Sequence, residues 1–348
     1  MNSRAMVDIV VVGGGPVGLA AAVEARLAGL TVTVIEPRTG PIDKACGEGL
    51  MPGGIPLLHR LGVSPIGRTL AGVGYFSTTR GVQHHFAAGP ALGVRRTALH
   101  DVLAARAQTL GIDRITGRAD AIEQHGDSIT VAVGQVRVQG RWLLGCDGLH
   151  SSVARWAGLA APMRQGGRRF GIRQHFAVRP WSDLIEVHYG PNAELYVTPV
   201  ADDIVGVAML APQGISYDMA LAGVPDIAER LALAEPTSER RGAGPFRQRT
   251  TARTAGRVLL VGDASGYVDA LTGEGLRLGF AQASAAIASV VAGDVSRYEG
   301  EWRQLTRDSR MLTSGLVAWA ESPLRGALVP AAARLPGLFG AVVERLAR

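Results

Sequence analysis

The first 36 residues contain a glycine pattern that few folds can accommodate. Residues 8–12, DIVVV, form a short apolar run typical of a buried strand, and they lead directly into GGGPVG at residues 13–18. An apolar helix is expected over residues 17–28 and a second strand over 31–35, and the acid Glu36 comes directly after that strand. Strand, glycines, helix, strand and acid in this order predict a βαβ unit that binds a dinucleotide. The glycines would let backbone N–H groups approach a pyrophosphate, and the acid would accept from a ribose hydroxyl.

A second glycine-rich stretch lies far along the chain, at residues 258–280. A four-residue apolar run ends at Gly262 and Asp263, and Gly273 and Gly275 open a long apolar helix. A carboxylate is therefore expected at the carboxyl end of a strand, where doubly wound sheets bind ligands. It could accept from the ribityl hydroxyls of a flavin, and the helix N-terminus favours the anionic ring of a reduced flavin. Taken alone, the same pattern fits a strand, a turn and a capped core helix equally well.

Three further segments show strand and turn signals. Asp147 ends another apolar strand, and Ser151 follows it as the expected cap of a short helix. Residues 112–146 predict a three-stranded meander, 72–87 a hairpin and 170–210 an antiparallel sheet. Such a sheet, inserted into a dinucleotide fold, would form a wall for a second ligand.

These patterns predict an α/β protein in which a Rossmann-type FAD-binding domain is interleaved with an antiparallel-sheet substrate domain and followed by C-terminal helices. The FAD-binding domain is assigned residues 1–71, 97–168 and 250–297. The substrate domain is assigned residues 72–96 and 169–249, and the C-terminal helices residues 298–348.

The C-terminal helices are rich in Ala, Leu and Val, and breaks are expected at Pro323, Pro330 and Pro336. The last segment, GLFGAVVERLAR, could lie in a membrane interface, but packing on the protein body or on a second subunit is favoured. No run of 18 apolar residues occurs, so a transmembrane span is not expected. Peripheral membrane contact stays open, as does the choice between monomer and homodimer.

Arginine carries nearly all of the positive charge. The chain has 36 basic and 30 acidic residues, and Lys44 is its only lysine. The most basic stretch, residues 238–257, is predicted to be a solvated linker. It contains a single aromatic residue, Phe246, and so lacks the aromatic side chains on which nucleic-acid bases stack. No nucleic-acid partner is therefore predicted. Cys46 and Cys146 are too few for a disulfide framework and lack metal-ligand spacing, which predicts no metal and a reducing cytoplasm.

Four motifs follow one another along the chain: GGGPVG at residues 13–18, IEPR at 35–38, GCDGLHS at 145–151 and GDASGYVDALTGEGL at 262–276. With these motifs in this order, the chain resembles the flavoprotein family of para-hydroxybenzoate hydroxylase, which also includes geranylgeranyl reductases and flavin-dependent halogenases. The resemblance covers about residues 7–295. It implies one extended FAD, NAD(P)H as a transient co-substrate and no second dinucleotide fold.

The resemblance also implies a set of cofactor-binding residues, which lie in these motifs and at the start of a predicted helix: Gly13, Gly15, Pro16, Val17, Gly18, Glu36, Pro37, Arg38, Arg96, Asp147, Asp263, Gly273, Gly275 and Leu276. In this assignment the three motif glycines lie at the pyrophosphate and Glu36 at the adenosine ribose. Asp263 binds the ribityl chain, and Leu276 lies beneath the pyrimidine edge of the ring. Asp147 belongs to a motif associated with both FAD and NAD(P)H.

Some positions depart from the family patterns. Ala270 and Arg277 replace a proline and an asparagine of the hydroxylases, and the CGEGL and TGEGL segments are closer to the geranylgeranyl reductases. The reductase signature Tyr-x-Trp-x-Phe-Pro is not kept at residues 195–199, LYVTP. The Trp-x-Trp-x-Ile-Pro segment and the substrate-side lysine of halogenases are not evident.

Three hypotheses follow. In the first, the protein is an NAD(P)H-using FAD monooxygenase that hydroxylates a small, hydrophobic, electron-rich molecule, phenolic or polyketide-like, through a flavin C4a-hydroperoxide. In the second, it is a prenyl reductase that saturates isolated double bonds, with Cys46 near the reacting carbon. In the third, it binds a dinucleotide without turnover. Cys46 is the sole candidate catalytic residue, and no thiolate-stabilising partner for it is visible in the sequence.

Overall fold

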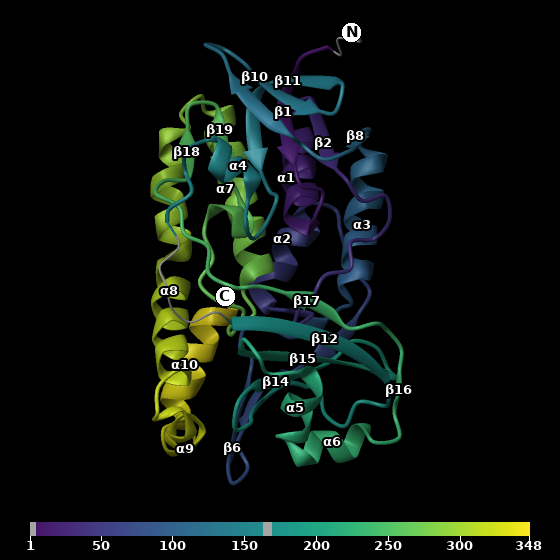
Figure 1. Ribbon diagram of the computed structural model, residues 1–348, viewed down its shortest axis with the longest axis vertical. Coiled ribbons are helices and arrows are strands. Elements are labelled where there is room, and N and C mark those ends of the chain that lie inside the picture. The colour runs from purple at the N-terminus through teal and green to yellow at the C-terminus, as the bar shows by residue number, and fades with distance from the viewer. Residues whose placement is uncertain (1–4, 163–168) are drawn as a thin grey trace.

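The computed structural model describes residues 5–162 and 169–348, and its chain forms two large sheets, one above the other in Figure 1. The first has the strand order β18-β19-β11-β1-β2-β8, with β10 paired to β11 and β9 to β10. Its strands are β1 (Val7–Val12), β2 (Val32–Glu36), β8 (Asp113–Thr116), β9 (Ala121–Gln124), β10 (Ile129–Val133), β11 (Val136–Gly145), β18 (Thr254–Ala255) and β19 (Val258–Leu260). The strands β19, β11, β1, β2 and β8 run parallel, so their carboxyl ends meet at one edge.

Helices α1 (Pro16–Leu27), α7 (Gly275–Val291) and α8 (Ser296–Ala320) cover one face of this sheet. Small residues of α1 and α7 lie against the strands, among them Ala21, Ala22, Ala283 and Ala286, and they allow the helices to approach closely. The strands β9 and β10, which extend the sheet from the first half of β11, and the short helix α4 (Ser152–Trp156) pack on the other face. Helix α3 (Arg96–Thr109) packs beside α1.

The βαβ prediction is confirmed, and the meander prediction is partly wrong. Residues 112–146 form four strands, of which the first, β8, pairs in parallel with β2 rather than joining the meander. The other three do form an antiparallel meander. Local turn signals separate strands, but they do not say which neighbour a strand pairs with.

The second sheet has the order β16-β12-β15-β14-β13-β5-β6, with β17 also paired to β12. Its strands are β5 (Gly72–Phe76), β6 (Gly81–His85), β12 (Arg169–Ala177), β13 (Leu184–Tyr189), β14 (Glu194–Pro199), β15 (Ile204–Pro212), β16 (Glu235–Pro236) and β17 (Arg241–Ala243). All neighbours are antiparallel except β5 and β13. Helices α5 (Tyr217–Ala222) and α6 (Pro225–Leu231) pack on it. The predicted fold class, in which an antiparallel sheet is interleaved with a dinucleotide-binding fold, is confirmed.

The segment 49–93, between β2 and α3, carries smaller elements besides β5 and β6 of the second sheet. It contains the small sheet β3 (Gly49–Leu50), β7 (Ala91–Gly93) and β4 (Arg68–Leu70), the 3-10 turn η1 (Pro52–Gly54) and helix α2 (Ile55–Arg60). Of the predicted domain boundaries, the one between residues 168 and 169 borders the stretch 163–168, which is outside the described residues.

The C-terminal region consists of α8, the turn η3 (Arg325–Ala327), α9 (Leu328–Arg334) and α10 (Pro336–Ala347). The expected break at Pro330 is wrong, because this residue lies in the first turn of α9, where its missing N–H costs nothing. Within the described residues no single helix is long and apolar enough to cross a membrane. Segments 325–334 and 336–347, which meet at 106°, reach that length and composition only when taken together.

The arginine-rich stretch 238–257 is only in part the solvated linker predicted: Arg240, Arg241, Arg247 and Arg249 are exposed, but other residues of the stretch are packed. It contributes β17 and β18, and the guanidinium of Arg253, which is 8% exposed, lies 3.9 Å from the ring centroid of Trp302. Phe246 is also buried. The segment therefore joins the two sheets partly as packed structure.

Candidate active site

A cavity of about 510 Å³ is lined by residues from both large sheets and from α10. It begins at the carboxyl ends of β1, β2, β11 and β19, the edge at which parallel sheets bind ligands. Every predicted cofactor residue except Gly18 lines it, and so does Cys46. Three motifs that are separated by more than a hundred residues each thus meet around one space.

The glycine motif packs so closely that side chains are excluded at Gly13 and Gly18. Gly13 has a φ of +106°, and a Cβ there would lie 2.4 Å from the carbonyl oxygen of Cys146. A Cβ on Gly18 would lie 1.8 Å from the carbonyl oxygen of Gly13. Gly18 therefore serves the contact between α1 and β1 and does not reach the cavity, whereas Gly15 faces the guanidinium of Arg96.

Glu36 is 1% exposed and ties the glycine motif to the end of β2. Its Oε2 accepts from the amide of Gly14 at 2.8 Å, and its Oε1 accepts from the backbone N–H and Nε of Arg38 at 3.1 and 2.7 Å. A carboxylate has about four lone-pair sites, so one acceptor position is left for a ribose hydroxyl. The residue has a structural role in addition to the predicted binding role.

The carboxylate of Asp147 is used within the protein. Its Oδ1 accepts from the hydroxyl of Ser151 at 2.5 Å, and its Oδ2 accepts from the amides of Ser152 and Val153 at 2.7 and 3.1 Å. Ser151 in turn caps α4 as predicted, accepting from the amide of Ala154. Burial raises the pKa of Asp147, and these donors oppose the rise. Asp147 therefore shapes the cavity wall at Gly148 mainly by holding the turn before α4.

Asp263 has a different environment. It lies in the turn η2 (Gly262–Ser265), and within residues 5–162 and 169–348 its carboxylate has no hydrogen-bond partner. A Cβ on Gly275, the first residue of α7, would lie 3.8 Å from its Oδ1, so the carboxylate lies beside the helix N-terminus as predicted. Burial raises the pKa of Asp263, and the positive charges of Lys44 and Arg96 oppose the rise.

Cationic groups complete this half of the cavity. The Nε of Arg96 is buried without a hydrogen-bond partner among the described residues, and the guanidinium lies 3.9 Å from the position of a Cβ on Gly15. Burial lowers the pKa of Lys44, the only lysine of the chain. An unpaired arginine beside a glycine motif suits a pyrophosphate, and an unpaired carboxylate suits hydroxyl donors. The donor set therefore fits a dinucleotide with a polyhydroxylated chain, as in FAD.

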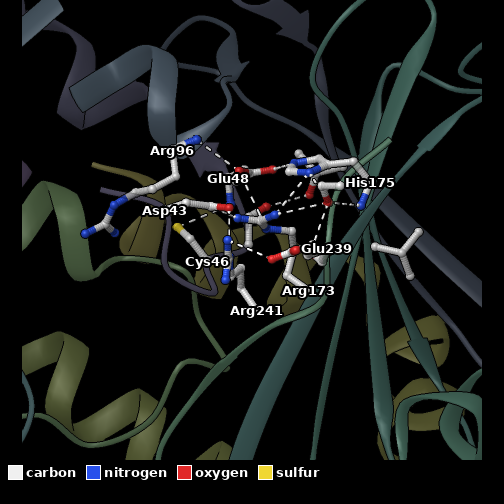
Figure 2. Close-up of polar contacts among 12 residues, drawn as sticks. Asp43, Cys46, Glu48, Arg96, Arg173, His175, Glu239 and Arg241 are labelled. Carbon is white, nitrogen blue, oxygen red and sulfur yellow. Dashed lines mark hydrogen bonds and ion pairs between the residues drawn. The ribbon is translucent and has the colours of Figure 1, made fainter. Parts of the chain in front are cut away.

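A buried ionic cluster fixes the loop that carries Lys44 and Cys46 (Figure 2). Glu48 is 3% exposed, its Oε1 accepts from the amide of Arg96 at 2.9 Å, and its Oε2 lies 2.5 Å from Nε2 of His175 on β12. Arg173, also on β12, donates to Asp43, and its Nη1 lies 3.1 Å from Nδ1 of His175. Since a guanidinium can only donate, Nδ1 accepts and Nε2 carries the proton toward Glu48. The cluster joins the loop to the second sheet.

Sequence reasoning missed several of these residues. Glu48 lies inside the CGEGL segment at residues 46–50, and Lys44 lies two residues before it. His100, one turn into α3, is buried, and its Nε2 lies 3.0 Å from the carbonyl oxygen of Gly14. Its signal in the sequence was a single histidine on an apolar helix face, which is usually ordinary packing. Cys46 is partly buried, and its sulfur accepts from the amide of Glu48 at 3.4 Å.

The other end of the cavity is uncharged. The second sheet, α10 and their neighbours supply only apolar and aromatic residues to its lining, including Met51, Val73, Tyr75, Phe86, Ile185, Val187, Tyr196, Met209, Phe246, Tyr267, Val343 and Leu346. The hydroxyl of Tyr196 donates to the carbonyl of Leu271 at 3.1 Å. This part of the cavity can hold an apolar or aromatic molecule away from water.

Behind this wall, Arg169 contacts both Glu194 and Asp269. All three side chains are buried, and two carboxylates share one guanidinium. Burial raises the pKa of Glu194 to about 7. No group of three or more His, Cys, Asp or Glu side chains in the described part of the chain is arranged to hold a metal ion.

The fold and the cavity define a flavoprotein with a Rossmann-type dinucleotide site. The chain belongs to the family defined by the FAD binding domain, whose sequence profile matches residues 6–296. The protein is therefore an FAD-dependent oxidoreductase, and the predicted resemblance is confirmed at the level of the family and its cofactor.

Individual relatives span several activities. Digeranylgeranylglycerophospholipid reductase 1 of Methanothermobacter thermautotrophicus is 29% identical over 332 residues, which cover 87% of this chain and 82% of the relative. The 12-dehydrotetracycline 5-monooxygenase/anhydrotetracycline 6-monooxygenase of Streptomyces rimosus is 28% identical over 79% of this chain and 61% of that relative. The structure of the flavin-dependent brominase Bmp2 superposes with a TM-score of 0.84 at 20% identity, covering 99% of this chain and 94% of that one, and shows a shared fold.

Proposed function

We propose that this protein is an NAD(P)H-using FAD monooxygenase that hydroxylates a small, hydrophobic, electron-rich molecule of phenolic or polyketide-like type. The observation that carries the proposal is the uncharged, aromatic end of the cavity, to which Tyr75, Phe86, Tyr196, Phe246 and Tyr267 contribute rings. Aromatic side chains favour stacked or edge-on contacts with a planar ring. A tetracycline monooxygenase among the relatives supports the same reaction class.

In this proposal the charged half of the cavity binds FAD and the apolar half binds the substrate. The glycine motif and Arg96 would hold the FAD pyrophosphate, Glu36 the adenosine ribose and Asp263 the ribityl hydroxyls. When bound, FAD supplies the redox chemistry: it accepts electrons from NAD(P)H and activates dioxygen. The N-terminus of α7, beside Asp263, would stabilise negative charge on the ring by about 0.3 to 2 kcal/mol.

The protein itself would exclude water from the cavity and orient the substrate. The aliphatic and aromatic lining from β5, β13, β14 and α10 would exclude water from the reacting end of the cavity, which limits side reactions with solvent. Among residues 5–162 and 169–348, the lining offers no carboxylate or histidine there, so substrate orientation would depend on shape and on tyrosine hydroxyls. The proposal keeps residues 72–96 and 169–249 as the substrate domain and the remaining segments up to residue 297 as the FAD-binding domain.

The test is an oxygen-electrode assay with flavin-loaded protein, NADH or NADPH and a panel of phenols. Dioxygen consumption that depends on a phenol, with a hydroxylated product of plus 16 mass units by the insertion of one oxygen atom, is expected. A product with ¹⁸O from labelled dioxygen identifies the oxygen source. If no phenol stimulates NAD(P)H oxidation, the monooxygenase proposal fails.

A second candidate is a reductase of isolated prenyl double bonds. It is favoured by the position of Cys46 in the cavity wall and by the similarity to digeranylgeranylglycerophospholipid reductase over most of both chains. Anaerobic turnover with saturation of an alkene would support this candidate over the first. A colourless protein that takes up no flavin on reconstitution would support neither.

A further inference from the structure

The turn between α9 and α10 and the loop before η3 form one end of the molecule (Figure 1). We call residues 322–327 and 334–338 the C-terminal tip. Its leucines are unusually exposed for this residue type: Leu324 is 70%, Leu335 56% and Leu338 63% exposed. The indole of Trp319, 37% exposed, donates to the carbonyl of Leu324 at 2.9 Å and so lies at the same tip.

The opposite side of these helices is already packed. Leu328, Val329, Phe339 and Val343 are buried in the core that α9 and α10 share with β5 and β6. The exposed leucines are therefore a second apolar face, and the described part of the chain provides nothing that covers it. Contiguous exposed apolar residues on a folded protein usually mark an interaction site.

The charge pattern indicates which partner fits this face. The C-terminal tip contains two charged side chains, Arg325 and Arg334, and the exposed acid Glu321 directly precedes it. Arg80, at the exposed turn of the β5–β6 hairpin that packs on α9 and α10, adds a third cation at this end of the molecule. Leucines and a tryptophan flanked by arginines match a bilayer with anionic headgroups, since the leucines enter the acyl boundary and arginines meet phosphates. A second copy of the chain would bring like charges together.

We propose that the C-terminal tip docks reversibly on an anionic lipid surface. This docking stands apart from the proposed reaction and needs no flavin chemistry. What it adds rests on the proposed function: Leu338 is exposed in the first turn of α10, and the last turns of the same helix line the cavity with Val343, Leu346 and Ala347, so one helix links the docking face to the apolar end of the cavity. The substrate class is then a lipid-soluble phenol or a related molecule with a long apolar chain.

Vesicle co-sedimentation of the flavin-loaded protein tests the docking. Binding is expected to vesicles of phosphatidylcholine with phosphatidylglycerol, weaker binding to phosphatidylcholine alone, and a loss of affinity as salt rises. The double variant Leu335→Glu/Leu338→Glu should bind at least about tenfold more weakly, because two inserted apolar side chains are replaced by charges. Arg325→Gln/Arg334→Gln should remove the preference for anionic lipid.

A matched control is available in Leu233→Glu. Leu233 is 99% exposed and lies between α6 and β16, and Figure 1 shows α6 on the other side of the β6 hairpin from α9, so this variant should bind vesicles like the parent. All substituted residues are exposed, and unchanged thermal midpoints and flavin spectra would show intact folding. The proposal is overturned if anionic vesicles bind no protein, or if Leu335→Glu/Leu338→Glu and Leu233→Glu weaken vesicle binding equally. It is also overturned if the parent is a dimer by sedimentation equilibrium and Leu335→Glu/Leu338→Glu abolishes that dimer.

Outcomes for docking and for reaction remain separable. Vesicle binding without phenol-dependent dioxygen consumption would sustain the docking and defeat the proposed function. Phenol hydroxylation in solution without vesicle binding would do the reverse.

Discussion

Glu48 and His175 lie 127 positions apart in the chain, and their side chains meet with Nε2 of His175 2.5 Å from Oε2 of Glu48. The same carboxylate accepts a hydrogen bond from the backbone amide of Arg96 at the start of α3. One buried acid thus joins the cavity loop, a helix of the first sheet and a strand of the second. The position of Lys44 and Cys46 against the cavity depends on this junction.

Glu48→Gln should destabilise the protein strongly and loosen flavin binding. The amide keeps the size of the side chain but removes the charge that faces Arg173, whose Nε lies 3.8 Å from Oε1 of Glu48, and breaking a buried ionic pair typically costs about 3 to 5 kcal/mol. We expect a large fall in the thermal midpoint, measured by circular dichroism. Glu239→Gln is the control, because Glu239 pairs with Arg241 at the surface. Equal effects of the two changes would contradict the junction role.

Asp263→Ala should lose FAD. The carboxylate is unpaired among the described residues and would accept from flavin hydroxyls, and a hydrogen bond to a charged group contributes about 1.5 to 3 kcal/mol, which corresponds to roughly a tenfold to hundredfold change in Kd. Flavin absorbance after purification and titration of the apoprotein measure this loss. Asp218→Ala, which removes an exposed partner of Arg240, should leave occupancy unchanged. Full occupancy in Asp263→Ala would remove Asp263 from the site.

Gly18→Ala should prevent correct packing of α1. The added Cβ would lie 1.8 Å from the carbonyl oxygen of Gly13, and both groups belong to the backbone framework, so neither can move cheaply. Soluble yield and flavin content should fall together. Gly300→Ala is the control in α8, where a Cβ meets nothing within 4 Å, and there a gain of about 0.5 to 1 kcal/mol is expected from helix propensity.

Glu194→Gln should change how stability depends on pH. The folded-state pKa of Glu194, about 7, lies above its ordinary value of 4.5, so the carboxylate binds its proton more tightly in the folded chain than in the unfolded chain. Its contribution is fully present below pH 4.5 and is lost as pH rises through about 7, with an upper limit of about 3 kcal/mol. Thermal midpoints measured from pH 5 to 8 should therefore fall less in the variant than in the parent. Glu123→Gln, an exposed change on β9, should keep the parent profile.

Cys46→Ser separates the two candidate reactions. A hydroxylase should keep most of its phenol-dependent dioxygen consumption, since the thiol has no part in oxygen transfer. A prenyl reductase that uses the thiol near the reacting carbon should lose alkene saturation, measured anaerobically by mass spectrometry. Flavin content measured in parallel shows whether a loss arises from the reaction or from the cofactor. Full alkene saturation by the serine variant would remove the thiol from that mechanism.

Local patterns were sufficient for the parts of the site that are built from consecutive residues. The glycine motif, Glu36 and the turn at Asp263 could be placed because a strand, a turn and a helix start are each encoded over a few positions. Ser151 as the cap of α4 was predictable for the same reason. The convergence of these motifs followed from the rule that parallel strands present their carboxyl ends at one edge.

Contacts between distant residues could not be read in this way. Nothing near Glu48 in sequence indicates that its partner is His175, because that pairing is set by how β12 lies against the cavity loop. The same limit explains β8, whose parallel neighbour β2 is almost eighty residues earlier. Asp147 looked like a ligand-binding acid because its position matches the others, while its carboxylate is occupied by the first turn of α4.

The single lysine allows cofactor occupancy of the cavity to be measured by chemical modification. Since Lys44 lines the cavity and every other basic side chain apart from histidine is arginine, an amine-directed reagent can modify the protein only there and at its α-amino group. Peptide mass mapping of the emptied and reconstituted forms would then display cofactor residence as shielding of one side chain. No engineered label is needed to follow how long the flavin stays.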